Sequence, residues 1–263
     1  MAELQALIFD VDGTLAETER DGHRVSFNLA FGEARLDWDW SIERYGELLA
    51  ITGGKERIRH YIDRYRPEFQ IPGDAAAYIT DLHRRKTAHY TRMVEKGAVS
   101  LRPGIARLLA QARQRNLRLA IATTTSPDNV IALLTYVLGA DSSAWFDVIA
   151  AGDIVPAKKP APDIYRYALR ELNLPAAACL ALEDSANGLI SARGAGIGTV
   201  ITMSSYTRKE RFEGALLVVD SLGEPAAPAL VTGGDAVAVV AGDHACVDID
   251  LLAKLHGFQQ TKR

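Results

Sequence analysis

The chain has 263 residues, of which 48% are hydrophobic and 24% are charged, and its formal net charge is -3. This length is enough to bury a substantial core in one large domain or two small ones. The longest obvious cluster of cations covers only residues 83–86. The charge pattern therefore argues against nucleic-acid binding as the main task.

Cysteine usage and the apolar segments indicate the compartment. Two cysteines, Cys179 and Cys246, do not make a disulfide framework in a chain of this length. The sequence enters an apolar run at residue 4 without a basic segment typical of a signal peptide, and no apolar stretch is long enough to span a bilayer. We expect a soluble, cytoplasmic protein, monomeric and without a membrane partner.

The first predicted element is a nearly continuous apolar run at residues 4–9, which is typical of a strand buried on both faces of a parallel sheet. From about residue 18 to residue 96, apolar positions recur every three or four residues among charged and aromatic ones, which predicts a series of helices. Residues 97–104 are expected to lead the chain back from this helical segment.

Beyond this linker, helical and strand patterns alternate. We predict helices at 105–115, 129–138, 162–172 and 186–195, and strands at 118–122, 146–150, 179–182 and 198–202. Such alternation implies an α/β fold with a doubly wound parallel sheet. We therefore expect a discontinuous core domain, residues 1–17 and 97–263, with an all-helical domain of residues 18–96 inserted after its first strand. Residues 259–263 are expected to fray.

Four polar clusters follow predicted strands, and sites in open parallel sheets lie at these strand ends. The clusters are Asp10-Val11-Asp12-Gly13-Thr14, Thr123-Thr124-Thr125, Lys158-Lys159-Pro160 and Glu183-Asp184-Ser185. The carboxylates of Asp10, Glu183 and Asp184 are the hard oxygen ligands that Mg²⁺ prefers. The pattern therefore predicts a magnesium site at this edge of the sheet.

The same clusters contain the groups needed for phosphoryl transfer. A phosphate between the metal and a lysine is neutralised from two sides, and Thr123 with nearby backbone amides can hold its other oxygens. Asp10 could then attack phosphorus to give an aspartyl-phosphate. Asp12, two residues further on, could protonate the leaving group and later deprotonate the attacking water.

Each cluster, taken singly, also has a purely structural explanation. Asp-x-Asp-Gly is a plausible turn, and Thr123 or Glu183-Asp184-Ser185 can cap a helix. Lys158-Lys159 alone is typical of a solvated loop. The order of the clusters at successive strand ends favours the catalytic interpretation over these alternatives.

The four clusters together resemble the four motifs of the haloacid dehalogenase superfamily, including a helical cap inserted after the first motif. The resemblance implies that Asp10 is the nucleophile and Asp12 the general acid and base. It also implies that Thr123 and Lys159 hold the transferring phosphate. Magnesium would then be bound by Asp10, the backbone carbonyl of Asp12, Glu183 and Asp184.

The cap residues extend the resemblance. Glu17-Thr18-Glu19, Thr52-Gly53-Gly54-Lys55-Glu56-Arg57, Leu101-Arg102-Pro103-Gly104 and Gly152-Asp153-Ile154-Val155-Pro156 are similar to segments of the CbbY branch, which hydrolyses the 1-phosphate of xylulose-1,5-bisphosphate. The implied substrate-binding residues are Glu17, His23, Tyr45, Gly54, Lys55, Arg57, Lys86 and Thr124. The segment 19–23 is one residue longer than in that branch, which leaves the role of His23 open.

Several alternatives stay open on the sequence alone. Gly53-Gly54 can be a simple turn between helices with solvated charges beside it, in place of a grip on a second phosphate. β-Phosphoglucomutases share the fold, cap type and motifs, and a broad sugar-phosphate or phosphoglycolate phosphatase is a third interpretation. A catalytically inactive binding protein on this fold is a fourth, against which intact Asp10, Asp12, Lys159 and Asp184 argue.

Overall fold

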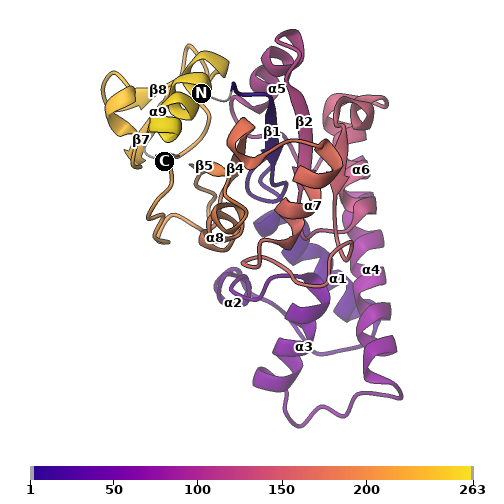
Figure 1. The fold of residues 1–263 in the computed structure, drawn as a ribbon. Coiled ribbons are helices and arrows are strands. Elements are labelled where there is room, and N and C mark those ends of the chain that lie inside the picture. The colour runs from indigo at the N-terminus through magenta and orange to yellow at the C-terminus, as the bar shows by residue number, and fades with distance from the viewer. Residues whose placement is uncertain (1–2, 262–263) are drawn as a thin grey trace.

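The computed structural model describes residues 3–261. A mainly parallel sheet lies at its centre, and helices cover both faces (Figure 1). The strand order is β3-β2-β1-β4-β5-β6-β7-β8, with β1 to β6 paired in parallel and the last two strands antiparallel. The strands are β1 (Ala6–Phe9), β2 (Arg118–Ala122), β3 (Val148–Ala150), β4 (Cys179–Glu183), β5 (Gly198–Thr202), β6 (Leu217–Val219), β7 (Ala229–Gly233) and β8 (His244–Ala245). This arrangement confirms the predicted fold class.

The α-helices fall into an N-terminal group and a group that flanks the sheet. The first group is α1 (Arg24–Glu33), α2 (Ile42–Leu48), α3 (Gly54–Tyr65) and α4 (Ala75–Glu95). The second is α5 (Ile105–Gln114), α6 (Pro127–Leu138), α7 (Asp163–Leu172), α8 (Ala186–Gly194) and α9 (Ile249–Thr261). No helix in residues 3–261 is long and apolar enough to cross a membrane.

β1 lies in the middle of the sheet because its side chains are apolar on both sides. Leu7 and Phe9 belong to the hydrophobic cluster on the side of α5, α6 and α9, whereas Ala6 and Ile8 belong to the cluster beneath α7. Successive side chains of a strand point to opposite faces, so a continuous apolar run is buried on both faces of the sheet. The strand that leads to Asp10 is therefore held from both faces.

The inserted helices have a core of their own, which is rich in aromatic side chains. Phe27, Phe31 and Trp40 pack with ring centroids 4.7–6.1 Å apart. The last turns of α4 differ, because Tyr90 and Val94 are buried in the main core and α4 runs beside α6 (Figure 1). α4 thus ties the inserted helices to the sheet, while the exact domain boundaries stay a prediction.

The segment after β5 contains elements that the periodicity did not predict. β7 and β8 extend the sheet beyond β6, and α9 packs its buried side chains into the main core. α9 includes residues 259–261, so the expectation of a frayed end is wrong for those three positions. Residues 262 and 263 lie outside the described part of the chain.

Candidate active site

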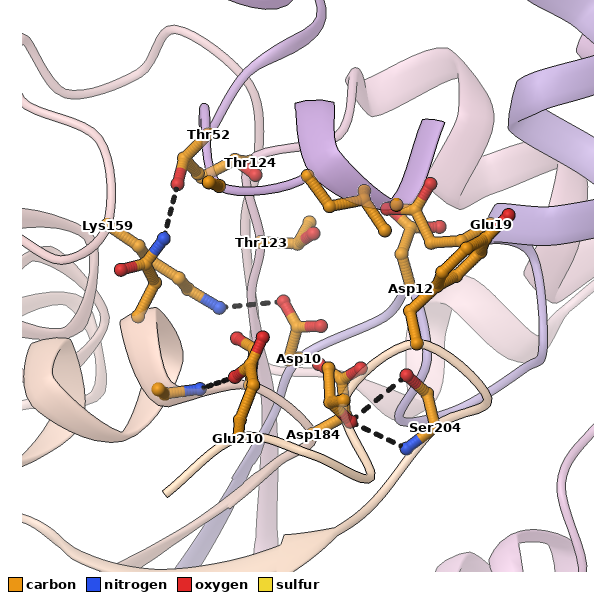
Figure 2. Close-up of a pocket in the computed structure, with 18 of the residues that line it drawn as sticks. Asp10, Asp12, Glu19, Thr52, Thr123, Thr124, Lys159, Asp184, Ser204 and Glu210 are labelled. Atoms are coloured by element: carbon orange, nitrogen blue, oxygen red, sulfur yellow. Dashed lines mark hydrogen bonds and ion pairs between the residues drawn. The ribbon is translucent and has the colours of Figure 1, made fainter. Parts of the chain in front are cut away.

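Asp10, Lys159 and Glu183 form the centre of the site, near the carboxyl ends of the strands. Figure 2 shows Lys159 pointing toward Asp10. Asp10 directly follows β1, Glu183 ends β4, and Lys159 lies in the loop between β3 and α7. Lys159 Nζ donates to Asp10 Oδ1 at 2.7 Å and to Glu183 Oε1 at 2.5 Å. The hydroxyl of Tyr165 donates to the same glutamate oxygen at 2.6 Å. All four side chains are buried, and the Lys159 ammonium group lies between the carboxylates of Asp10 and Glu183.

The carboxylates of Asp10, Glu183 and Asp184 offer oxygens that lie within 4.8 Å of one another. Burial raises the pKa of Asp10 to about 8 against the opposing charge of Lys159. Burial and then the charge of Asp10 hold the pKa of Asp184 well above its usual range. Glu183 Oε2 is also buried without a hydrogen-bond partner among the described residues. A divalent cation would relieve this excess of buried negative charge, so the residues fit Mg²⁺.

Thr123 and Thr124 lie beside Asp10 at the end of β2 and line a cavity of about 300 Å³. The backbone N–H of Thr123 donates to Ala150 O at 3.0 Å, which fixes the threonine at the strand end. α6 begins at Pro127, so backbone N–H groups at its N-terminus lie close along the chain. Such a strand end followed by a helix N-terminus suits a phosphate.

Asp12 is held by residues of the cap. Its Oδ1 accepts from Thr18 Oγ1 at 2.5 Å and lies 2.8 Å from His23 Nε2, and Lys86 Nζ lies 2.8 Å from His23 Nδ1. Although burial opposes ionisation, the His23 imidazole lowers the pKa of Asp12 to about 2. Asp12 is therefore ionised in this arrangement, as a base that accepts a proton must be.

His23 reaches Asp12 in spite of the extra residue expected before it. Residues Glu19–His23 form one turn of π-helix at the start of α1. A π-turn accommodates one additional residue within a helical path without displacing the rest of the helix. This turn explains how a longer segment can still present His23, whose side chain is buried against the Tyr90 ring at 4.1 Å.

Tyr45, Arg57 and Glu19 form a second connected group in the cap. Arg57 Nη1 donates to Tyr45 Oη at 2.9 Å, and Tyr45 Oη donates to Glu19 Oε2 at 2.5 Å. Arg57 and Glu19 line the large cavity, and both also line a small adjoining cavity of about 30 Å³. The small cavity is further lined by Gly53, Gly54, His83, Lys86 and Thr124. Most of the expected substrate-binding residues thus line this small cavity, where the cations of Arg57 and Lys86 face the carboxylates of Asp12 and Glu19.

Lys55 and Glu17 make contacts other than those expected from the sequence. Lys55 of α3 forms an ion pair with Asp153 in the loop after β3, and Lys55 is absent from the described lining of either cavity. Glu17 Oε1 accepts from the Ser205 hydroxyl at 2.5 Å and from the Ser205 backbone N–H at 3.1 Å. Substrate binding by these two side chains stays a prediction.

Other polar residues line the large cavity but were not identified from the sequence. Ser204, Tyr206, Thr207 and Glu210 come from the loop after β5, and Thr52 and Asn187 face each other across the cap and core. Glu210 accepts from the Ala186 N–H at 2.6 Å (Figure 2). The sequence signal for this loop is weak, because these residue types are common in any turn.

Comparison with known proteins is consistent with this geometry. The sequence model of the haloacid dehalogenase-like hydrolase family matches residues 4–196. The chain therefore belongs to this family, and it is a phosphatase. Its curated relatives include the plasmid-encoded CbbY of Cupriavidus necator, 50% identical over 86% of this chain and 88% of that protein. CbbY of Cereibacter sphaeroides is 49% identical over 84% of this chain and 94% of that protein.

The similarity extends to solved structures. A mutant of CbbY from Rhodobacter sphaeroides in complex with xylulose-1,5-bisphosphate is 49% identical, with a TM-score of 0.77 over 83% of this chain and 94% of that one. A β-phosphoglucomutase from Clostridium difficile reaches a TM-score of 0.68 over 83% of this chain and 91% of that one, at 21% identity, and so shares the fold. The chain is thus a CbbY-like member of the haloacid dehalogenase-like hydrolases.

Proposed function

We propose that this chain is a magnesium-dependent phosphatase that removes the 1-phosphate of xylulose-1,5-bisphosphate through a phosphorylated Asp10. The observation that carries the proposal is the buried assembly of Asp10, Lys159, Glu183 and Asp184 beneath a cap cavity to which Arg57 and Lys86 contribute positive charge. The 49% identical CbbY structure in complex with this bisphosphate supports the choice of substrate. We further infer that the protein acts in the cytoplasm, as a monomer.

In the first step Asp10 attacks the phosphorus of the 1-phosphate, and the bond from phosphorus to the sugar oxygen breaks. Lys159 and Thr123 hold the phosphoryl oxygens, and the N-terminus of α6 adds positive charge. Asp12 gives a proton to the departing sugar oxygen. A nearby substrate phosphate raises the low pKa of Asp12, which favours the protonated form at this stage.

In the second step water attacks the phosphorus of the aspartyl-phosphate and releases inorganic phosphate and ionised Asp10. Asp12, now a carboxylate, takes the proton from this water, and its contacts with Thr18 and His23 keep it in place. Bound magnesium would stabilise the charge on the transferring phosphoryl group. Asp10, the Asp12 backbone carbonyl, Glu183 and Asp184 are the residues that would hold it.

The second phosphate of the substrate requires cations at a distance from Asp10. Arg57 and Lys86 line the small cavity with Gly53 and Gly54 at the N-terminus of α3. Lys55 is close along the chain, and substrate binding would have to divert it from Asp153. A bisphosphate therefore matches the charge of both ends of the site better than a monophosphate does.

The test is a panel of sugar mono- and bisphosphates assayed with Mg²⁺ and scored by kcat/KM. We expect xylulose-1,5-bisphosphate to be preferred, with xylulose-5-phosphate and phosphate as products and no activity in excess EDTA. The mutase interpretation predicts bisphosphate-primed conversion of β-glucose-1-phosphate to glucose-6-phosphate with little phosphate release. If that conversion is faster, the proposed substrate is wrong.

A further inference from the structure

Arg102 stands at the return from the cap to the core and carries an unusual set of hydrogen bonds. We propose that Arg102 is a positioning residue that sets the Asp184 carboxylate for the divalent cation by fixing the two segments packed against it. This inference rests on the proposed magnesium-dependent function. It concerns a residue that contacts neither the phosphate site nor the cavity described above.

The backbone around Arg102, where the chain returns from cap to core, is hydrogen-bonded to the segment where the chain leaves the core for the cap. Its N–H donates to Leu15 O at 2.9 Å, and the neighbouring Leu101 pairs with Ala16 in an isolated antiparallel bridge. The side chain is 7% exposed. Its position is therefore fixed on one side by the chain that follows Asp10 and Asp12.

The guanidinium donates only to backbone carbonyls. Nη1 donates to Gly13 O and, at 2.8 Å, to Thr202 O. Nη2 donates to Met203 O at 2.7 Å and to Asp220 O at 2.8 Å. One planar group thus ties the turn after β1 to the ends of β5 and β6, which an ammonium group could not span with the same geometry.

Two of these segments, the turn after β1 and the chain after β5, pack against the Asp184 side chain. Gly13 has a φ of +82°, and a side chain there would overlap the Asp184 carboxylate and touch Ser204. Ser204, the residue after Met203, lies beside Asp184 (Figure 2), and its side chain lowers the pKa of that carboxyl. Gly13 and Ser204 therefore both lie against Asp184. Arg102 binds the carbonyl of Gly13 itself and that of Met203, the residue before Ser204.

The charge of Arg102 acts on two carboxylates. Its hydrogen-bond partners are neutral carbonyls, Glu17 forms an ion pair with Nε at 3.9 Å, and Asp184 is the next carboxylate that the guanidinium stabilises. A buried cation stabilises negative charges around it. Arg102 can thus offset part of the repulsion between Asp184 and Asp10 before a metal binds.

A purely structural role would give the same hydrogen bonds, and Arg107 offers a matched control for it. Arg107 of α5 also donates to three backbone carbonyls, those of Leu222, Gly223 and Val247, and it pairs with Glu224 at 3.0 Å. None of these partners lines the cavity around Asp10. Its loss should cost stability without altering the metal site.

The experiment compares Arg102→Met and Arg107→Met for binding of Mn²⁺, measured by electron paramagnetic resonance without substrate and with Mg²⁺ as competitor. We expect Arg102→Met to raise the Mn²⁺ Kd by about 10- to 100-fold, as for other residues that orient metal ligands. Arg107→Met should keep the wild-type Kd, although both variants lower the Tm. If Arg102→Met does not fold, Arg102→Lys decides by the same comparison.

An unchanged Kd in the Arg102 variant, or an equal rise in both variants, overturns the inference. Failure of the proposed function looks different, because the wild type itself would then bind no Mn²⁺ that Mg²⁺ displaces. Ser204→Ala gives an independent reading. It removes the hydroxyl that lies beside Asp184 and leaves Arg102 intact, so it should also raise the Kd.

Discussion

At the scale of single residues, the site is a set of buried charges in which the carboxylates of Asp10, Glu183 and Asp184 outnumber the single cation of Lys159. The pKa of Asp10 is raised by burial from 3.8 to about 8. The folded state therefore binds this proton more tightly than the unfolded state does. As a result, Asp10 costs stability progressively as the pH rises from about 4 to about 8.

This linkage predicts the behaviour of Asp10→Asn, which removes the ionisable group with little change of shape. Without metal, the variant should gain Tm relative to the wild type at pH 8 and less so at pH 5. Added Mg²⁺ should raise the Tm of the wild type at pH 8 more than that of the variant. Thermal denaturation followed by circular dichroism measures both. An equal difference in Tm at the two pH values would count against the raised pKa.

The residues that were identified from the sequence are those whose position is dictated by parallel strands. Asp10, Thr123 and Glu183 end successive strands of the sheet, so a common edge brings them together. Ser204 and Glu210 were missed because their loop has no comparable signal. They reach the site only through the packing of the chain beyond β5.

At the scale of elements, the ion pair between Lys55 of α3 and Asp153 of the core joins cap and core beside the site. Asp153 also accepts from Lys158 Nζ at 2.5 Å, and Lys158 precedes Lys159, the proposed phosphate-binding lysine. Both partners are partly exposed, so the pair is worth at most about 1 kcal/mol. The sequence indicated cations in the cap but not this partner, which comes from a distant loop.

Lys55→Ala should separate two roles of this lysine. If Lys55 binds the distal phosphate, the preference for xylulose-1,5-bisphosphate over a matched monophosphate should fall on the order of ten- to a hundredfold. Hydrolysis of para-nitrophenyl phosphate should hardly change, because this small ester needs only the core. The measurement is kcat/KM for the three substrates.

Asp153→Asn is the matched control for Lys55→Ala. It removes the ion pair but leaves Lys55 free to bind phosphate, so the preference for the bisphosphate should be kept. If both variants instead slow every substrate equally, Lys55 acts through cap closure and not through the substrate.

The elements found by periodicity are those with long or continuous apolar patterns. β2 and β5 match the predicted strands residue for residue, because β5 is buried along its length and β2 at every position after Arg118. β6 has three residues and β8 has two, which is too short for any period to show. The π-turn at Glu19–His23 was also beyond periodicity, because a single turn of five residues gives no repeat.

At the scale of the whole molecule, the segment after β6 is part of the fold and not an appendage. Leu252 and Leu255 of α9 are fully buried in the main hydrophobic cluster, and β7 covers the edge of β6. We therefore expect the segment after β6 to contribute to the stability of the fold and not to the proposed reaction.

Leu255→Ala should therefore destabilise the protein by about 2–5 kcal/mol, the usual cost of a cavity in a packed core. Leu230→Ala is the control within the same segment, because Leu230 is 44% exposed and its loss should fall within about 0.5 kcal/mol. Urea denaturation gives both values. A marked fall of kcat in folded Leu255→Ala would contradict a purely structural role.

The proposed reaction depends above all on Asp10 accepting the 1-phosphate of xylulose-1,5-bisphosphate. Rapid acid quenching of enzyme mixed with Mg²⁺ and substrate labelled with ³²P in the 1-phosphate, followed by peptide mapping, tests this step most directly. We predict transient label on the peptide that contains Asp10, and none with Asp10→Asn. Label on another residue, or undiminished turnover by Asp10→Asn, would contradict the proposed mechanism.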